Sequence, residues 1–139
     1  MKRVSAVVLL KEDGSALFQL RDNKPGLPCA GQWSLPSGRR ERDETPESCA
    51  RRELWEETGY ACGELHPLGV LAPGHDGYEN YRMTAFWANY DGLQPLKCLE
   101  GQEIRFIERE AAGRYSIPDF ILPVWDSALQ AVKVYGIKK

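Results

Sequence analysis

Three glutamates lie close together in the segment RRELWEETG, residues 51–59. If this segment is a helix, Glu53, Glu56 and Glu57 stand at positions i, i+3 and i+4, and their carboxylates project from one face within a single turn. Like charges at this spacing destabilise a helix by roughly 0.2–0.5 kcal/mol per pair. A hard divalent cation such as Mg²⁺, which prefers carboxylate oxygens, would reverse that repulsion. A solvated acidic face, partnered by the two preceding arginines, is the alternative interpretation.

The residues upstream favour the cation site. From Gly38 to Tyr60 the chain follows the pattern G-x5-E-x7-R-E-U-x-E-E-x-G-U, in which U is a bulky apolar residue. The pattern resembles the Nudix box, the signature of the Nudix hydrolases, whose MutT branch is the best known. Two positions depart from the usual residues, because Tyr60 replaces an aliphatic residue and Ser37, just before the box, replaces a glycine. So many fixed identities at fixed spacing rarely arise by chance.

This resemblance implies an α/β fold: a Nudix α/β/α sandwich in which a mixed β-sheet is flanked by helices, as one domain over residues 1–139. It also implies an Mg²⁺-dependent pyrophosphohydrolase, with Mn²⁺ able to substitute, that cleaves the diphosphate of a nucleoside diphosphate linked to another moiety X. A non-catalytic Nudix domain that senses nucleotides or ADP-ribose is the alternative. The complete set of box glutamates favours the enzyme.

The resemblance also assigns roles position by position. Glu53, Glu56 and Glu57 correspond to metal ligands or the general base, and the carbonyl of Ser37 or Gly38 would complete the metal shell. Arg52 and Glu44 correspond to an ion pair that orients the box loop against the helix.

A second acidic segment, LEGQEIRFI at residues 99–107, resembles the loop that supplies an extra metal ligand in the MutT branch. Glu100 matches that ligand better than Glu103 does, and either could replace Glu53 as the general base. A charged loop ahead of an edge strand is the alternative interpretation.

The identity of X stays open from the sequence. The candidates for substrate contacts are Tyr78, Tyr81, Trp87, Phe120 and Asp119, with Trp33, Phe18 and Trp125 as further aromatic residues. For each aromatic residue, packing in the core is the alternative. Asp119 precedes the last helix, in a region that contributes a purine-reading polar side chain in the MutT branch.

Composition limits the partners. The net charge of −2 gives no field that would attract a nucleic-acid polymer or a membrane surface, and no apolar run approaches the roughly twenty residues that a membrane helix needs. The four cysteines are scattered, which suits a reduced, cytoplasmic protein. We therefore expect a nucleotide-type small molecule as the partner, and a monomer or homodimer.

The elements that must position these residues follow from the apolar pattern and the turn signals. The box helix should begin after Thr45, with Pro46 in its first turn, and end at Gly59, with Ala50, Leu54 and Thr58 facing the core. Gly38 and Gly59 are expected to adopt backbone conformations that a Cβ would strain. Strands are expected at 4–10, 16–21, 33–38, 65–72, 81–90 and 104–107, with a hairpin turn at Asp13–Gly14, a loop over 22–32, a brief helix near 109–113 and a last helix ending near Tyr135.

Overall fold

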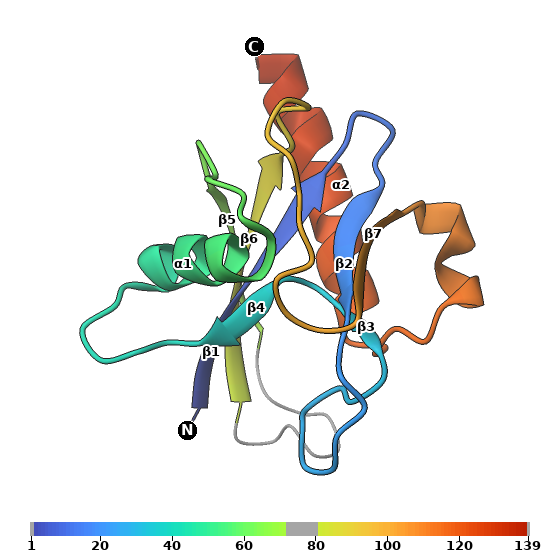
Figure 1. The fold of residues 1–139 in the computed structure, drawn as a ribbon. Helices are drawn as coiled ribbons and strands as arrows, with labels where there is room; N and C mark the ends of the chain where they lie inside the picture. The colour runs from blue at the N-terminus through green and yellow to red at the C-terminus, as the bar shows by residue number, and fades with distance from the viewer. Residues whose placement is uncertain (1, 72–80, 139) are drawn as a thin grey trace.

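The computed structural model describes residues 2–71 and 81–138. Seven strands, two α-helices and a short 3₁₀ helix follow one another along these residues. They are β1 (Lys2–Leu10), β2 (Ala16–Leu20), β3 (Trp33–Ser34), β4 (Ser37–Arg39), α1 (Pro46–Thr58), β5 (His66–Leu71), β6 (Tyr81–Asn89), β7 (Glu103–Ile107), η1 (Arg109–Arg114) and α2 (Ile121–Lys138). The expected order of strands and helices is confirmed (Figure 1).

The sheet is mixed, as the sequence predicts. β1 runs parallel to β6 along its whole length, from Lys2 opposite Tyr81 to Leu10 opposite Asn89, and the other pairings of the described strands are antiparallel. β1 meets β2 only where Leu10 lies opposite Ala16, and the other half of that edge pairs with β4. β2 instead continues beside β7 and β3. The sheet therefore opens between β2 and β4.

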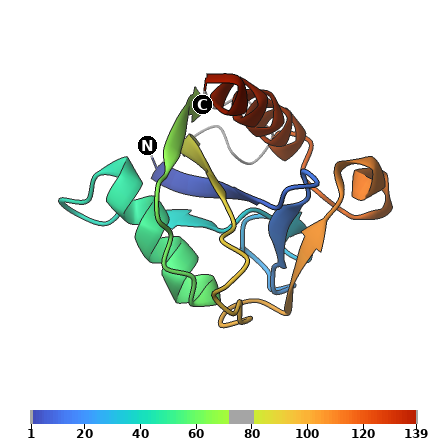
Figure 2. The same cartoon turned by 90° about the horizontal axis from the view of Figure 1, so that it is seen from above.

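Two hydrophobic clusters lie on opposite faces of β1. Ala6, Val8 and Leu10 pack in the cluster that includes α2, while Val7 and Leu9 pack in the cluster that includes α1. Seen from above, the two helices lie on opposite sides of the central strands (Figure 2). A strand that is covered on both faces needs apolar side chains at consecutive positions, which explains the uninterrupted apolar run in the sequence.

The box helix has the ends that the sequence predicts. Thr45 Oγ1 accepts a hydrogen bond from Ser48 N, and Ser48 Oγ accepts one from Thr45 N, so the two residues form a capping box in front of Pro46. At the other end Gly59 adopts the left-handed conformation with φ 76° and donates its N–H to Trp55 O. The stripe of Ala50, Leu54 and Thr58 is buried.

Other expectations hold with small changes. The predicted strand over 33–38 is two short strands, because the chain crosses from β2 to β1 at Leu35–Pro36, and Pro36 O accepts a hydrogen bond from Val7 N. The hairpin is confirmed, with Gly14 at φ 87° and the Asp13 carboxylate accepting from Ser15 N. Neither of the α-helices within the described residues combines the length and the apolar character needed to cross a membrane.

Candidate active site

Glu57 lies on the buried side of α1, although it is an acidic residue. Its side chain accepts a hydrogen bond at 3.2 Å from the backbone N–H of Ser37 in β4, and the residue is only 2% exposed. Burial, together with the nearby charges of Glu53 and Glu100, raises the pKa of Glu57 to about 9. Burial also raises the pKa of Glu53. Two carboxylates of the box are therefore held where negative charge is unfavourable.

Gly38 makes room for one of these carboxylates. A Cβ at this position would lie 2.1 Å from Glu53 Cδ and 2.3 Å from both carboxylate oxygens. The expectation that Gly38 has a strained backbone is wrong, since its φ is not positive. Glycine is needed there because the Glu53 carboxylate packs directly against the backbone of β4. For Gly59, whose φ is positive, the expectation is confirmed.

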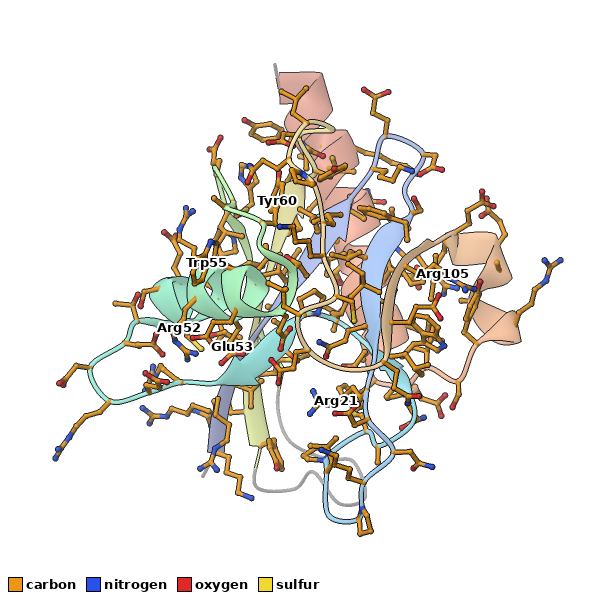
Figure 3. The ribbon with its side chains drawn as sticks, viewed as in Figure 1. Arg21, Arg52, Glu53, Trp55, Tyr60 and Arg105 are labelled. Atoms are coloured by element: carbon orange, nitrogen blue, oxygen red, sulfur yellow. The ribbon has the colours of Figure 1, made fainter. Side chains whose placement is uncertain are left out.

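Arg52 connects the box loop to the helix. Its Nε donates to Glu44 Oε2 at 2.6 Å and its Nη2 donates to Glu44 Oε1 at 2.9 Å, so the predicted ion pair is confirmed in bidentate form. These hydrogen bonds are the main reason that the pKa of Glu44 falls to about 2. Arg52 also donates to Glu53 Oε1 at 2.7 Å and to the carbonyl of Arg39 at 3.1 Å. Figure 3 shows Arg52 and Glu53 together on α1, beside β4.

Glu56 takes a different position from the other two box glutamates. Its side chain is 46% exposed, and its carboxylate accepts a hydrogen bond from Arg52 at 3.2 Å. It is therefore turned toward the arginine on the outer side of α1. Its assignment as a metal ligand stays a prediction.

The loop that carries Glu100 is fixed to the end of β2. Gln19, which is buried, donates its side-chain amide to Glu100 O at 3.0 Å. Gln102 donates its backbone N–H to Leu20 O at 2.8 Å and its side-chain amide to Arg21 O at 2.9 Å. Between them Gly101 adopts a φ of 80°, and a Cβ there would lie 2.7 Å from Leu20 O. These contacts fix the backbone of the loop at Glu100.

A cavity of about 690 Å³ brings these groups together. Glu53, Glu57 and Glu100 line it, together with Arg21 and Arg39. Its other walls are largely apolar and include Val4, Ala6, Leu27, Pro28, Leu35, Met83 and Ile121. This volume lies in the range of roughly 300–1,000 Å³ that small-molecule sites occupy. Carboxylates, arginines and an apolar wall in one cavity suit a ligand that has both an anionic and an apolar part.

Arg21 is the most unusual group in this cavity. Its Nε is buried and, within the described part of the chain, has no hydrogen-bond partner. Buried donors are nearly always paired in folded proteins. The side chain follows the end of β2 and also lowers the pKa of Glu57 through its charge (Figure 3). An anionic ligand in the cavity would give this donor a partner.

Only some of the predicted substrate contacts lie at the cavity. Tyr81 and Phe120 line it. Trp87 does not, because its ring is buried under α2 and stacks on His66 with centroids 4.2 Å apart, so its assignment to the substrate site is corrected to the core. Asp119 is exposed and outside the lining. Phe18, Trp33 and Trp125 are buried in the core, and Tyr78 lies outside the described residues.

The structure also separates the two candidates on the second acidic segment. Glu103 pairs with Leu20 at the start of β7, and its carboxylate binds Arg105 rather than facing the cavity. The structure therefore places Glu103 in an ion pair with Arg105 outside the cavity lining, and its assignment to the metal site stays a prediction. Glu100 lines the cavity, and its charge raises the pKa of both Glu53 and Glu57.

A divalent cation fits the chemistry of this donor set. Within residues 2–71 and 81–138, no three acidic, histidine or cysteine side chains converge closely enough to form a ready-made metal cluster. Glu53, Glu57 and Glu100 nevertheless line one cavity, and the charges of Glu53 and Glu100 raise the pKa of Glu57, a repulsion that a cation would relieve. Hard carboxylate oxygens are the ligands that Mg²⁺ prefers.

Comparison with known proteins decides the family. The family model described as the NUDIX domain matches residues 1–122. The chain belongs to the Nudix family. A putative nudix hydrolase 1 of Caenorhabditis elegans is 35% identical over 116 residues, which are 84% of this chain and 29% of that protein. An RNA pyrophosphohydrolase of Xanthomonas campestris is 34% identical over 79 residues, or 57% of this chain and 34% of that protein. The chain thus spans about a third of the length of these relatives.

The Nudix fold extends over nearly the whole chain. A mutT/nudix family protein from Listeria innocua has a solved structure that superposes with a TM-score of 0.78 at 22% identity, covering 99% of this chain and 98% of that one. The predicted α/β sandwich is therefore confirmed.

The departure of this Nudix box at Tyr60 has a local explanation. Tyr60 is buried beside Tyr90, and its hydroxyl accepts a hydrogen bond at 2.9 Å from Asp91 N. The ring thus fills the apolar position that an aliphatic residue would occupy, and the hydroxyl reaches a backbone partner at the end of β6.

Several cavity residues were missed from the sequence. Arg21 is the main example, and Gln19, which holds the Glu100 loop at the cavity, was missed as well. A signal for both residues existed. They stand two residues apart at the end of an otherwise apolar strand, where alternate residues share a face. Two polar residues on one face of such a strand indicate that, at this end, the face no longer packs against the hydrophobic core.

Proposed function

We propose that this Nudix chain is an Mg²⁺-dependent pyrophosphohydrolase that acts on a nucleoside diphosphate linked to a further group X. The observation that carries the proposal is the shared cavity, in which Glu53, Glu57 and Glu100 lie with Arg21 and an apolar wall. The names of relatives, including an RNA pyrophosphohydrolase, support the same reaction class. The carboxylates suit metal-bound phosphates, and the apolar wall with Tyr81 and Phe120 suits a nucleobase.

In the proposed reaction, a water oxygen bonds to one phosphorus of the diphosphate while the bridging P–O bond breaks. The products are a nucleoside monophosphate and phosphorylated X, and the proton of the water passes to a base. The chemistry that Mg²⁺ supplies when bound is charge neutralisation of the phosphates and a lowered pKa of a bound water. Glu57 and Glu100 would hold the ion, with Glu56 as a third ligand. Arg21 would donate to a phosphate oxygen.

Glu53 is the proposed base, with Glu100 as the alternative. The Glu53 carboxylate is fixed on both sides, by Arg52 at Oε1 and by the backbone at Gly38, so its position in the cavity is defined before substrate arrives. Burial raises its pKa, which moves a carboxylate toward the range useful for proton transfer.

The test is hydrolysis of a panel of nucleotides, followed as release of nucleoside monophosphate with Mg²⁺ and with EDTA. We expect Mg²⁺-dependent turnover of at least one substrate, and a loss of about a hundredfold or more in kcat for Glu53→Gln with a smaller change in KM. Glu12→Gln, which removes an exposed carboxylate from the β1–β2 turn, is the control. If Glu100→Gln shows the larger loss in kcat, Glu100 is the base. Nucleotide binding without any turnover would indicate the non-catalytic sensor instead.

A further inference from the structure

A second hollow lies beside the proposed active site. It has a volume of about 620 Å³ and is formed by the N-terminal end of β1 and the box loop that precedes α1. Five of the residues that line it are basic: Lys2, Arg3, Arg39, Arg40 and Arg42. In a chain with a net charge of −2, this is a local concentration of positive charge.

The positive charges of this basic hollow outnumber its negative charges. Within the described residues, none of the five basic side chains forms an ion pair. Of the three acidic residues in the lining, Glu44 is bound by Arg52 on two atoms, and Glu41 approaches Arg52 at 3.7 Å. Arg52 carries a single positive charge and cannot neutralise both carboxylates, so the lining keeps five basic against three acidic residues, an excess of two positive charges. Such a surface is predisposed to bind an anion.

The fold holds the basic hollow in place. β4 pairs with β1 so that Arg39 lies opposite Val4, and the backbone N–H of Arg40 donates to Arg3 O at 2.8 Å. On the other side of the loop, Arg52 donates to the carbonyl of Arg39 at 3.1 Å. The backbone at Arg39 and Arg40 is thus attached both to the central strand and to α1, so little ordering of this backbone is needed when an anion binds.

The basic hollow is continuous with the cavity that holds the carboxylates. Arg39, Arg40 and Glu41 line both. Arg39 directly follows Gly38, against which the Glu53 carboxylate packs. An anion in the basic hollow would therefore lie next to the diphosphate being cleaved.

We propose that the basic hollow binds phosphate groups carried by X, and that this chain prefers small-molecule substrates with phosphates beyond the diphosphate. The inference rests on the proposed function and extends it to the class of X. Guanidinium groups match phosphate oxygens in paired hydrogen bonds, and four of the five cations are arginines. The carboxylates of the neighbouring cavity repel such phosphates, so the basic hollow is where they are stabilised.

Binding is tested first without catalysis. Inorganic tripolyphosphate is titrated by calorimetry in EDTA at low ionic strength, where the carboxylate cavity has no cation to attract it. We expect binding by the wild type, and at least about tenfold weaker binding by Arg3→Gln/Arg42→Gln, which removes two charge-assisted hydrogen-bond donors from the basic hollow. Arg114→Gln/Lys133→Gln removes the same charge from exposed positions on η1 and α2 and should bind as the wild type does. Equal binding by all three proteins, or none by the wild type, would overturn the proposal while leaving the hydrolysis assay unaffected.

Substrate choice is tested second, with Mg²⁺. Adenosine 5′-tetraphosphate and ADP-glucose share the adenosine diphosphate and differ in the charge of X. The wild type should have the higher kcat/KM with the tetraphosphate. Arg3→Gln/Arg42→Gln should reduce that preference by about tenfold, whereas Arg114→Gln/Lys133→Gln should keep it. An unchanged preference in Arg3→Gln/Arg42→Gln would contradict the proposal, as would a strong preference for the 5′ end of an RNA over the tetraphosphate.

Discussion

At the scale of single residues, the site holds two groups in unfavourable states. Glu57 is a carboxylic acid inside the protein, and its side chain accepts a hydrogen bond from the backbone N–H of Ser37. Arg21 has a buried Nε without a partner in the described part of the chain. Each arrangement costs stability in the free protein, and each is relieved by a ligand of the opposite charge.

The buried acid makes stability depend on pH. With a pKa of about 9 when folded and 4.5 as its ordinary value, Glu57 keeps its proton in the folded state between these values, whereas the unfolded chain releases it. The folded state then binds more protons, so the free energy of unfolding in EDTA should fall as pH rises from about 5 to 9, by at most about 1.4 kcal/mol per pH unit. Urea unfolding at several pH values measures this slope. Glu57→Gln should flatten it and Glu12→Gln should not; equal slopes in all three proteins would show that Glu57 is not the cause.

The unpaired donor predicts a role in binding phosphate. Arg21→Gln removes the charge from the cavity, and we expect kcat/KM to fall by roughly ten- to a hundredfold, as for the loss of one charge-assisted hydrogen bond. Arg21→Lys, which keeps the charge and loses the Nε donor, should recover part of that loss. Because the donor lacks a partner in the free protein, neither variant should lower the thermal midpoint much. If Arg21→Gln kept the wild-type kcat/KM, Arg21 would not take part in binding the substrate.

At the scale of elements, α1 and β4 must approach closely for the site to form. The Glu53 carboxylate packs against Gly38, and this contact leaves no room for a Cβ. Gly38→Ala should therefore destabilise the fold by about 1–3 kcal/mol and strongly reduce activity. The same substitution in a Glu53→Ala background should cost much less, because the colliding carboxylate is gone. Gly63→Ala, at a position with no neighbour within 4 Å, is the control; additive losses in the double variant would refute the steric explanation.

The same elements show what the sequence could predict. The caps of α1 were predictable because they depend on residues at fixed, short spacing, whereas the Arg52–Glu44 pair followed from the resemblance to the Nudix box. The positions of Trp87 and Glu103 were not predictable, because which face of β6 is covered by α2 and where β7 pairs depend on contacts between distant segments. Tyr81 and Phe120 were proposed as aromatic candidates, but their place at one cavity follows only from the packing of β6 against the start of α2. The turn of Glu56 toward Arg52 is likewise a property of the packed site.

At the scale of the whole molecule, α2 links the core to the cavity. Its first residue, Ile121, lines the cavity with the preceding Phe120, and a turn later Trp125 is completely buried against Phe18, with its Nε1 donating to Gly14 O at 3.1 Å. The match to the Nudix family model ends at residue 122, so this anchor lies beyond it. The wall of the cavity is therefore held by a part of the chain outside the matched region.

This arrangement predicts that one core tryptophan supports both folding and substrate binding. Trp125→Ala should lower the free energy of unfolding by about 3–5 kcal/mol, because it removes a large buried side chain and leaves a cavity. The thermal midpoint should fall by roughly 10–20 °C for a domain of this size. Below that midpoint KM should rise more than kcat falls, since the loosened start of α2 carries Phe120 and Ile121 at the cavity wall. Trp55→Ala, which truncates a tryptophan that is 59% exposed on α1, should change stability by no more than about 0.5 kcal/mol. Similar midpoints for the two variants, measured by calorimetry, would show that α2 does not anchor the fold as the structure indicates.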